Sequence, residues 1–120
     1  MDEKLLSADE IVAAPDAEFE DVHVPEWNGT VRIRVLSAGE AIEFTERVKG
    51  EARKNMMLIL LQLTLSKADG TPMFTPQQLQ AIGKKNLKIL ARLQEKALKL
   101  NDLWPDKKKD RDLVDEAKND

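Results

Sequence analysis

Residues 56–65 read Met-Met-Leu-Ile-Leu-Leu-Gln-Leu-Thr-Leu, with polar side chains at only two positions. A helix with apolar groups around its whole circumference must be enclosed on all sides. A chain of 120 residues forms one modest domain, which has few elements to enclose such a helix. Two interpretations follow. The segment is the central helix of a small bundle, or one side of it is available to a partner or to a second copy of the chain.

The same segment ends the longest predicted helix. Ser37 and Glu40 have the spacing of a capping box, a signal for a helix start. Apolar residues then recur at steps of three and four, as on one face of a helix: Ala41, Phe44, Val48, Ala52, Met56, Ile59 and Leu63. The pattern predicts one helix from about residue 38 to residue 65. Gly50 costs roughly 1 kcal/mol in a helix interior and marks the place where a bend is expected.

Residues 22–36 are predicted to form a β-hairpin. Asn28 and Gly29 both tolerate the positive φ of a type I′ turn, which is the strongest short-range hairpin signal. A turn centred on this pair sets Val24 opposite Ile33 and Val22 opposite Val35 on one face, with His23 and Arg34 on the other. Pro25 lacks an N–H donor, so its strand is expected at the edge of the sheet.

Two helices are predicted in the C-terminal half. Thr75-Pro76 combines an N-cap with proline at the first helical position, and this helix ends near Gly83. The last helix covers residues 85–101, with one apolar face made of Leu87, Leu90, Leu93, Ala97 and Leu100. The Asp69-Gly70-Thr71-Pro72 segment before them has the composition of a turn.

The charge of the chain is unevenly distributed. Residues 1–26 carry nine acidic residues and one lysine, whereas residues 27–104 carry thirteen basic and seven acidic residues. Ser7 and Glu10 form a second capping-box spacing, which predicts a short helix within the acidic part. The acidic segment and the basic body either pair with each other or with a partner, or are simply two solvated surfaces.

Together these elements predict an α+β fold that is mainly α. A single domain over residues 19–104 consists of helices with one N-terminal β-hairpin packed on them. Residues 1–18 are expected to be an acidic, flexible arm, and residues 105–120 a disordered charged tail.

Several classes of function are disfavoured by composition. The chain has no cysteine and one histidine, His23, so thiolate metal sites, cysteine nucleophiles and most general-base schemes are excluded. It contains neither a phosphate-binding glycine loop nor a nucleophile elbow. We therefore expect neither an enzyme nor a cofactor or metal site. Without a long apolar run or a basic leader, a cytoplasmic protein with no membrane contact is predicted.

A basic stripe on the last helix is the main candidate for electrostatic recognition. Its members recur at steps of three and four: Lys85, Lys88, Arg92, Lys96 and Lys99. The net charge of the whole chain is −3, and no aromatic residues interleave with the stripe, so nucleic acid is not the expected partner. An acidic protein surface fits better.

Several segments in a fixed order resemble the tail assembly chaperones of long, non-contractile-tailed phages and prophages. The resemblance begins with residues 22–34, from Val-His-Val-Pro-Glu-Trp-Asn-Gly onward, and the Leu-Ser-Ala-Gly-Glu of residues 36–40. It continues with an apolar helix, an Asp-Gly-x-Pro-x-Phe-Thr turn at residues 69–75 and a Leu-x-x-Ile-Gly step at residues 79–83. The last segment, Ala-Leu-x-Leu-Asn, is at residues 97–101, so the resemblance spans about residues 19–104.

This resemblance implies a non-enzymatic protein that coats the tape measure protein and recruits tail tube subunits to it before leaving the finished tail. It also implies that a longer form is made by a programmed ribosomal frameshift. Lys107-Lys108-Lys109 is either the product of an A-rich slippery sequence or a solvated lysine cluster. A different structural adaptor of the tail-completion type, or a small nucleic-acid-binding regulator, remains an alternative.

The expected contacts with such a partner are apolar. The candidates are Trp27 in the hairpin and Met56, Met57, Leu60 and Leu61 in the apolar helix, beside the basic residues Lys85, Lys88, Arg92 and Lys96. The acidic arm is expected to cover one of these surfaces until a partner displaces it. Self-association is left open by the sequence.

Overall fold

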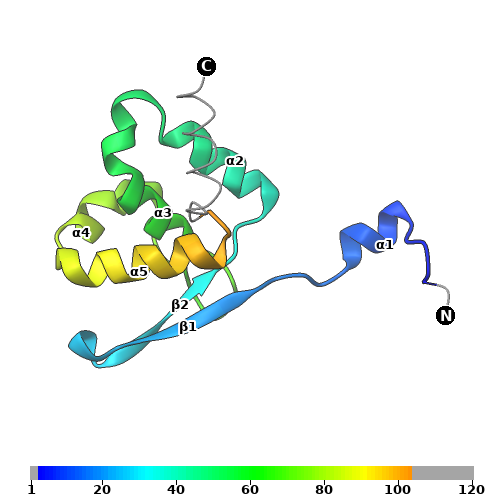
Figure 1. The fold of residues 1–120 in the computed structure, drawn as a ribbon, viewed down its shortest axis with the longest axis horizontal. Helices are drawn as coiled ribbons and strands as arrows, with labels where there is room; N and C mark the ends of the chain where they lie inside the picture. Colours follow the sequence, from blue (N-terminus) through cyan, green and yellow to red (C-terminus); the bar gives the residue numbers. More distant parts are fainter. Residues whose placement is uncertain (1–2, 104–120) are drawn as a thin grey trace, which may run out of the picture.

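The computed structural model describes residues 3–103 and shows all but the first of its α-helices gathered on one side of a small antiparallel sheet (Figure 1). The strands are β1 (Phe19–Val24), β2 (Gly29–Arg34) and β3 (Leu65–Ser66), in the order β1-β2-β3. The α-helices are α1 (Ala8–Ala13), α2 (Ala38–Arg47), α3 (Met56–Thr64), α4 (Leu79–Gly83) and α5 (Leu87–Leu100). The predicted α+β class, mainly helical, is confirmed.

The hairpin forms, but its turn differs from the predicted one. Val24 lies opposite Gly29 and Val22 opposite Val31, so Asn28-Gly29 is not a two-residue type I′ turn. The chain instead makes a 3₁₀ turn over Pro25–Trp27, and Asn28 closes it with φ of 53°. Proline has no N–H for the strand ladder, which ends the pairing at the residue before it.

The two faces of the hairpin are nevertheless those predicted. Ile33 lies opposite Glu20 rather than Val24, a shift by an even number of residues, which leaves every side chain on its original face. Val24 and Ile33 are fully buried, whereas His23 on the other face is exposed. The position of β1 at the sheet edge is also as expected.

The helix predicted from residue 38 to residue 65 is wrong as one continuous helix, because the chain breaks around Gly50, where the sequence indicates a bend. After α2, Gly50 has a φ of 62°, a left-handed conformation that no helix interior contains. A 3₁₀ helix at Gly50–Asn55 then leads into α3. At the other end the chain leaves α3 directly into β3, where Leu65 pairs with Ile33. The backbone N–H and C=O groups at the second edge of β2 need partners, and Leu65 and Ser66 supply them. These two residues therefore form a strand although they continue the helical pattern of the sequence.

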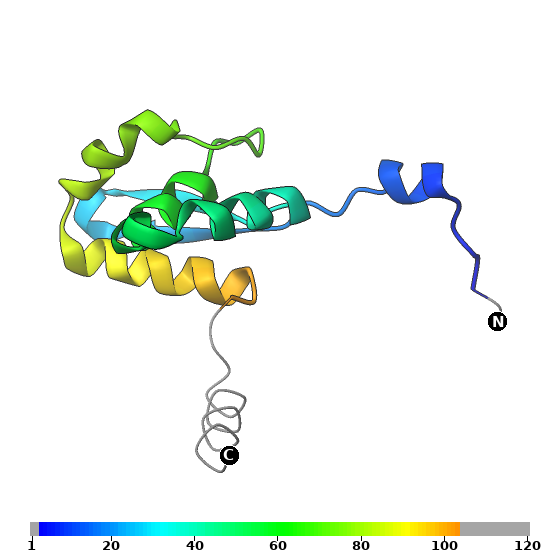
Figure 2. The ribbon, with the colours of Figure 1, turned by 90° about the horizontal axis from the view of Figure 1, so that it is seen from above.

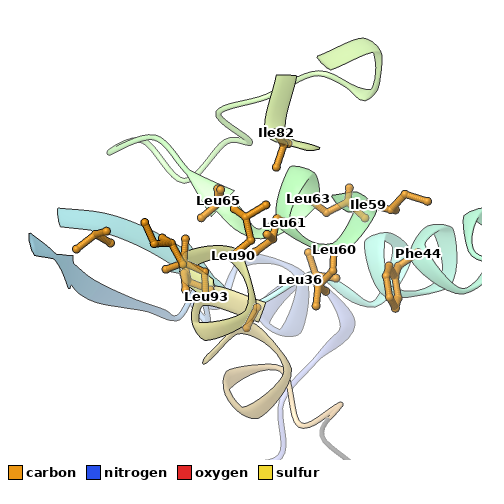
Figure 3. Packing of buried hydrophobic residues seen from close by; sticks show 14 residues of the cluster. Leu36, Phe44, Ile59, Leu60, Leu61, Leu63, Leu65, Ile82, Leu90 and Leu93 are labelled. Atoms are coloured by element: carbon orange, nitrogen blue, oxygen red, sulfur yellow. The ribbon is translucent and has the colours of Figure 1, made fainter. Parts of the chain in front are cut away.

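The apolar segment is the centre of the core. Leu60 and Leu61 are fully buried, and α3 is enclosed by the sheet, α2, α4 and α5 (Figure 3). The core consists of Val24, Ile33, Leu36, Phe44, Ile59, Leu60, Leu61, Leu63, Leu65, Ile82, Ile89, Leu90, Leu93 and Ala97. Of the two interpretations of residues 56–65, the structure therefore supports the central helix of a small bundle.

Side-chain bonds tie the end of α5 to the junction between β2 and α2. The Oδ1 atom of Asn101 accepts from the backbone N–H of Leu36 at 2.7 Å. Its Nδ2 atom donates to the carbonyl oxygens of Ala97 and Arg34. At the same junction, the guanidinium of Arg34 donates two bonds to the carboxylate of Glu40, at 2.8 and 2.6 Å.

The N-terminal arm lies apart from this core. The predicted capping box is confirmed: Ser7 and Glu10 bond each other's backbone N–H at the start of α1. No residue of α1 is buried, and both views place α1 away from the other helices (Figures 1 and 2). The chain joins the sheet at Glu18, whose carbonyl oxygen accepts from the N–H of Val35 at 2.9 Å. Trp104 and the predicted tail over residues 105–120, with Lys107-Lys108-Lys109, lie outside the described residues.

Candidate partner-binding groove

An apolar groove of about 370 Å³ opens at the tip of the hairpin. Its floor consists of Val31, Leu65, Ile82 and Leu90, of which the last three are buried. The half-buried rings of Trp27 and Phe74 also line it, together with Ala81, Met73 and Lys85. Its volume falls within the range of about 300–1,000 Å³ that is typical of ligand sites. We refer to it as the Trp27 groove.

Trp27 is positioned by the turn that replaced the predicted one. The 3₁₀ helix at Pro25–Trp27 places the indole ring against the core, where Lys85 lies over it with Nζ 5.5 Å from the ring centroid. A cation at this distance is attracted by the face of the ring. The structure thus brings together two of the predicted site residues that are 58 positions apart in the sequence.

A second contact joins the hairpin tip to α5. Arg92 donates two bonds to the carboxylate of Glu26, at 2.8 and 3.1 Å. The Arg92 guanidinium lowers the pKa of Glu26 from its usual 4.5 to about 2. Because both side chains are partly exposed to solvent, the pair fixes the relative position of the two elements more than it stabilises the fold.

The basic stripe is only partly as predicted. Asn86 caps α5 by accepting from the N–H groups of Lys88 and Ile89, so Lys85 precedes the helix and belongs to the groove instead. Lys88 and Lys96 are exposed on α5, while Arg92 is engaged by Glu26. Lys99 pairs with Glu95 at 3.0 Å.

The apolar candidates on α3 are separated from the groove. Leu60 and Leu61 are 0% exposed, so the prediction that they offer a contact surface is wrong: the small domain does enclose them. Met57 is half-buried against the core, and Met56, at the start of α3, is 39% exposed. Neither methionine lines the Trp27 groove.

Sequence reasoning missed Met73, Phe74 and Ile82 as groove residues. Met73 and Phe74 follow Pro72 in a loop that returns to β3, where the N–H of Met73 donates to the carbonyl oxygen of Leu65. The signal available in the sequence for a contact surface was this apolar pair, Met73 and Phe74, in an otherwise polar turn. Without β3, which was not predicted, nothing placed this pair beside Trp27.

The described residues do not indicate a metal site or a membrane-spanning segment. Among residues 3–103, no cluster of histidine, aspartate and glutamate has the composition to hold a metal ion. Within the same range no helix has the length and apolar character needed to cross a bilayer. A larger hollow of about 560 Å³ at the root of the arm is lined by Phe19 and by the ion-paired residues Arg32, Arg34 and Glu40.

The model of one protein family, described as phage tail assembly chaperone, matches residues 7–119. The chain belongs to the phage tail assembly chaperone family. The fold of this chaperone is similar to that of the solved bacteriophage HK97 tail assembly chaperone, with a TM-score of 0.57 and 24% sequence identity. That match covers 77% of this chain and 90% of the HK97 protein. Among curated proteins, none has a significant sequence match to this chain.

Proposed function

We propose that the chaperone binds the tape measure protein in the host cytoplasm and helps to recruit tail tube subunits to it. It acts by binding alone, with no cofactor and no catalysis, and is absent from the finished virion. The observation that carries this proposal is the Trp27 groove in a chain of this family, since it exposes aromatic and aliphatic surface to a partner.

The groove suits a helical client with apolar side chains. A partner helix can insert a few apolar side chains between Trp27, Phe74 and Met73, as in other helix-in-groove complexes. Lys85 and Lys88 are exposed at the same end of the molecule and favour acidic residues that flank those apolar positions. Basic residues at those flanking positions would be repelled.

Co-purification with the tape measure protein tests the proposal. Met73→Asp places a charge in the groove at a residue that is 45% exposed, so the fold should be retained. We expect client binding to weaken by at least about tenfold, or about 1.4 kcal/mol. Lys85→Glu should weaken binding as well, and this loss should be larger at low salt.

Ile42→Asp is the matched control. Ile42 is 65% exposed on α2 and does not line the groove, so this variant carries the same added charge at a different apolar surface position. Circular dichroism checks that all three variants fold. Equal client retention by Met73→Asp and by the wild-type protein would exclude the groove as the contact site. Retention of tail tube protein on the client complex, measured with and without the chaperone, tests recruitment.

A further inference from the structure

The Trp27 groove is open in the part of the chain that the structure describes. Residues 3–103 leave about 370 Å³ of it unfilled, and Met73 in its lining is 45% exposed. Aromatic and aliphatic walls that face water are unfavourable, because apolar surface gains free energy when it is removed from water. A segment that covers the groove while no client is bound would remove this cost.

The N-terminal arm is poorly placed to be that segment. It leaves the sheet at Phe19, the first residue of β1, whereas Trp27 follows the last residue of β1, and Figures 1 and 2 show α1 and the hairpin tip at opposite ends. To reach its own groove, the arm would have to reverse and run back along β1. Its linker, residues 14–18, spans at most about 18 Å, which is shorter than a strand of six residues at about 20 Å.

The other end of the described chain turns at the end of α5. Asp102 has a φ of 57°, the N–H of Leu103 donates to the carbonyl oxygen of Leu98 at 2.8 Å, and the N–H of Asp102 donates to that of Lys99 at 3.1 Å. This pair of bonds around a left-handed residue is a Schellman motif, which ends a helix. The chain after Leu103 therefore does not continue along the axis of α5.

The length of chain that follows is sufficient to return to the groove. The 14 residues of α5 extend over about 21 Å. The groove lies at the start of this helix, where Lys85 and Leu90 line it. From Leu103 to Leu113 the extended chain spans up to about 33 Å. Leu113 can thus reach the Trp27 groove of its own molecule with length to spare.

The sequence of this segment complements the groove. Residues 110–116 read Asp-Arg-Asp-Leu-Val-Asp-Glu, so an apolar pair is flanked by two acidic residues on each side, with one arginine among them. The groove is lined mostly by apolar side chains, and Lys84, Lys85 and Lys88 are exposed at the same end of the molecule. Apolar side chains between acidic ones are also the pattern that this groove favours in a client.

We infer that Leu113 and Val114 occupy the Trp27 groove of their own chain when no client is bound. The two side chains contact Trp27 and Phe74, and the flanking acidic residues face the lysines. Because the segment is tethered, its effective concentration is on the order of millimolar, so even a weak contact is populated. A client must displace the segment, and this competition rests on the proposed function, whereas the occupancy of the groove does not.

Intramolecular cross-linking of the chaperone alone tests the occupancy, since the natural chain contains no cysteine. The full chain with Val114→Cys and Met73→Cys is oxidised at low protein concentration. We expect a disulfide within one molecule to form at least about fivefold faster than in a chain with Val114→Cys and Ile42→Cys, because docking raises the effective concentration of the paired thiols.

Ile42 is a demanding control for this experiment. It is 65% exposed and does not line the groove. It lies in α2, which begins at the junction that the side chain of Asn101 holds, so random collisions of the segment with Ile42 are not disfavoured. Equal rates at Met73 and Ile42 would overturn the inference. A disulfide at Met73 that forms only between two molecules would overturn it as well.

Fluorescence quenching provides a second measurement without a client. Trp104→Phe leaves Trp27 as the only tryptophan. Adding Leu113→Asp should raise the quenching of Trp27 by acrylamide about twofold, because the groove is then open in most molecules. Ala117→Asp adds the same charge outside the apolar pair and should leave the quenching unchanged. Equal quenching with Leu113→Asp and with Ala117→Asp would overturn the inference.

The competition is measured with the tape measure protein as the probe. Leu113→Asp should bind it about fivefold more tightly than the wild-type chain does, because the binding-competent fraction rises. Unchanged affinity in a chain that forms the Val114–Met73 cross-link would overturn the competition. If Met73→Asp leaves client binding intact while the cross-link forms, the proposed client site fails and the occupancy of the groove stands.

Discussion

Leu61 and Met56 show how position on a single helix decides the role of a side chain. They are five residues apart on α3, and at about 100° per residue their side chains point in directions about 140° apart. Leu61 is 0% exposed and Met56 is 39% exposed. Both side chains are apolar, so the sequence alone does not distinguish the core residue from the surface residue.

Truncation of the two side chains should therefore have different effects. Leu61→Ala should lower the free energy of unfolding by about 2–5 kcal/mol, because it leaves a cavity in a fully packed site. Met56→Ala should change it by only about 0.5 kcal/mol, the usual range for surface substitutions. Urea denaturation of both variants measures the difference. A Leu61→Ala variant as stable as the wild type would contradict the enclosed position of α3.

Glu40 connects charge to stability at the junction of β2 and α2. The paired guanidinium of Arg34 lowers the pKa of Glu40 from its usual 4.5 to about 2, aided by the backbone N–H of Ser37. The unfolded chain therefore binds a proton at Glu40 before the folded chain does as the pH falls. The stability from this pair is fully present above about pH 4.5 and is lost as the pH falls toward 2.

Glu40→Gln should flatten this part of the pH dependence. Thermal unfolding between pH 2 and pH 5 measures it, with Glu43→Gln, at an exposed position of the same helix, as the control. We expect the unfolding temperature of the Glu40→Gln variant to change less across this range than that of the control. Identical curves for the two variants would show that the Arg34 pair contributes nothing to acid sensitivity.

At the scale of elements, Gly50 separates α2 from the core helix. Its φ of 62° lies in the left-handed region, where a side chain costs about 1–2 kcal/mol. No atom lies within 4 Å of the position that a Cβ would take, so backbone conformation alone should set the effect of a substitution. Gly39, in the first turn of α2, has equally open surroundings but no positive φ.

The two glycines therefore form a matched pair. Gly50→Ala should lower the free energy of unfolding by about 1–2 kcal/mol. Gly39→Ala should raise it by about 0.4–1 kcal/mol, because alanine restricts the unfolded chain without straining the helix. Chemical denaturation measures both. If alanine were equally tolerated at both positions, the break between α2 and α3 would not depend on the conformation of Gly50.

The elements that the sequence predicted well are those set by local signals. The capping boxes at Ser7 and Ser37 and the alternation of the hairpin depend on residues close in sequence, and all three are present in the structure. The predicted helix is not continuous because Gly50, where the sequence indicates only a bend, adopts a left-handed φ that a helix cannot contain. Val48 and Ala52 stay in phase with the apolar stripe on both sides of it, which favoured a bend over a break. β3 was missed because its two residues follow a helical pattern and form a strand only through pairing with β2.

At the scale of the whole molecule, the partner-binding groove could not be predicted from any one segment. It combines Trp27 from the hairpin, Met73 and Phe74 from the loop after β3, and Lys85 from the junction of α4 and α5. The sequence indicates Trp27 and Lys85 by separate signals, an aromatic ring in a turn and a charge in a basic stripe. Their proximity depends on β3, which brings the loop back to the sheet, and on Asn86, the N-cap of α5, which directly follows Lys85.

The backbone hydrogen bond between Val35 and Glu18 fixes the point at which the N-terminal arm joins the sheet. Residues 14–18 have no secondary structure and span at most about 18 Å when extended, so any object held by α1 stays within that radius of the sheet. Within this radius a partner bound to α1 can rotate without twisting β1, because the backbone dihedral angles of residues 14–18 can change instead. A pull on a partner held by α1 would therefore act on the hairpin edge at Glu18 before it reached the core.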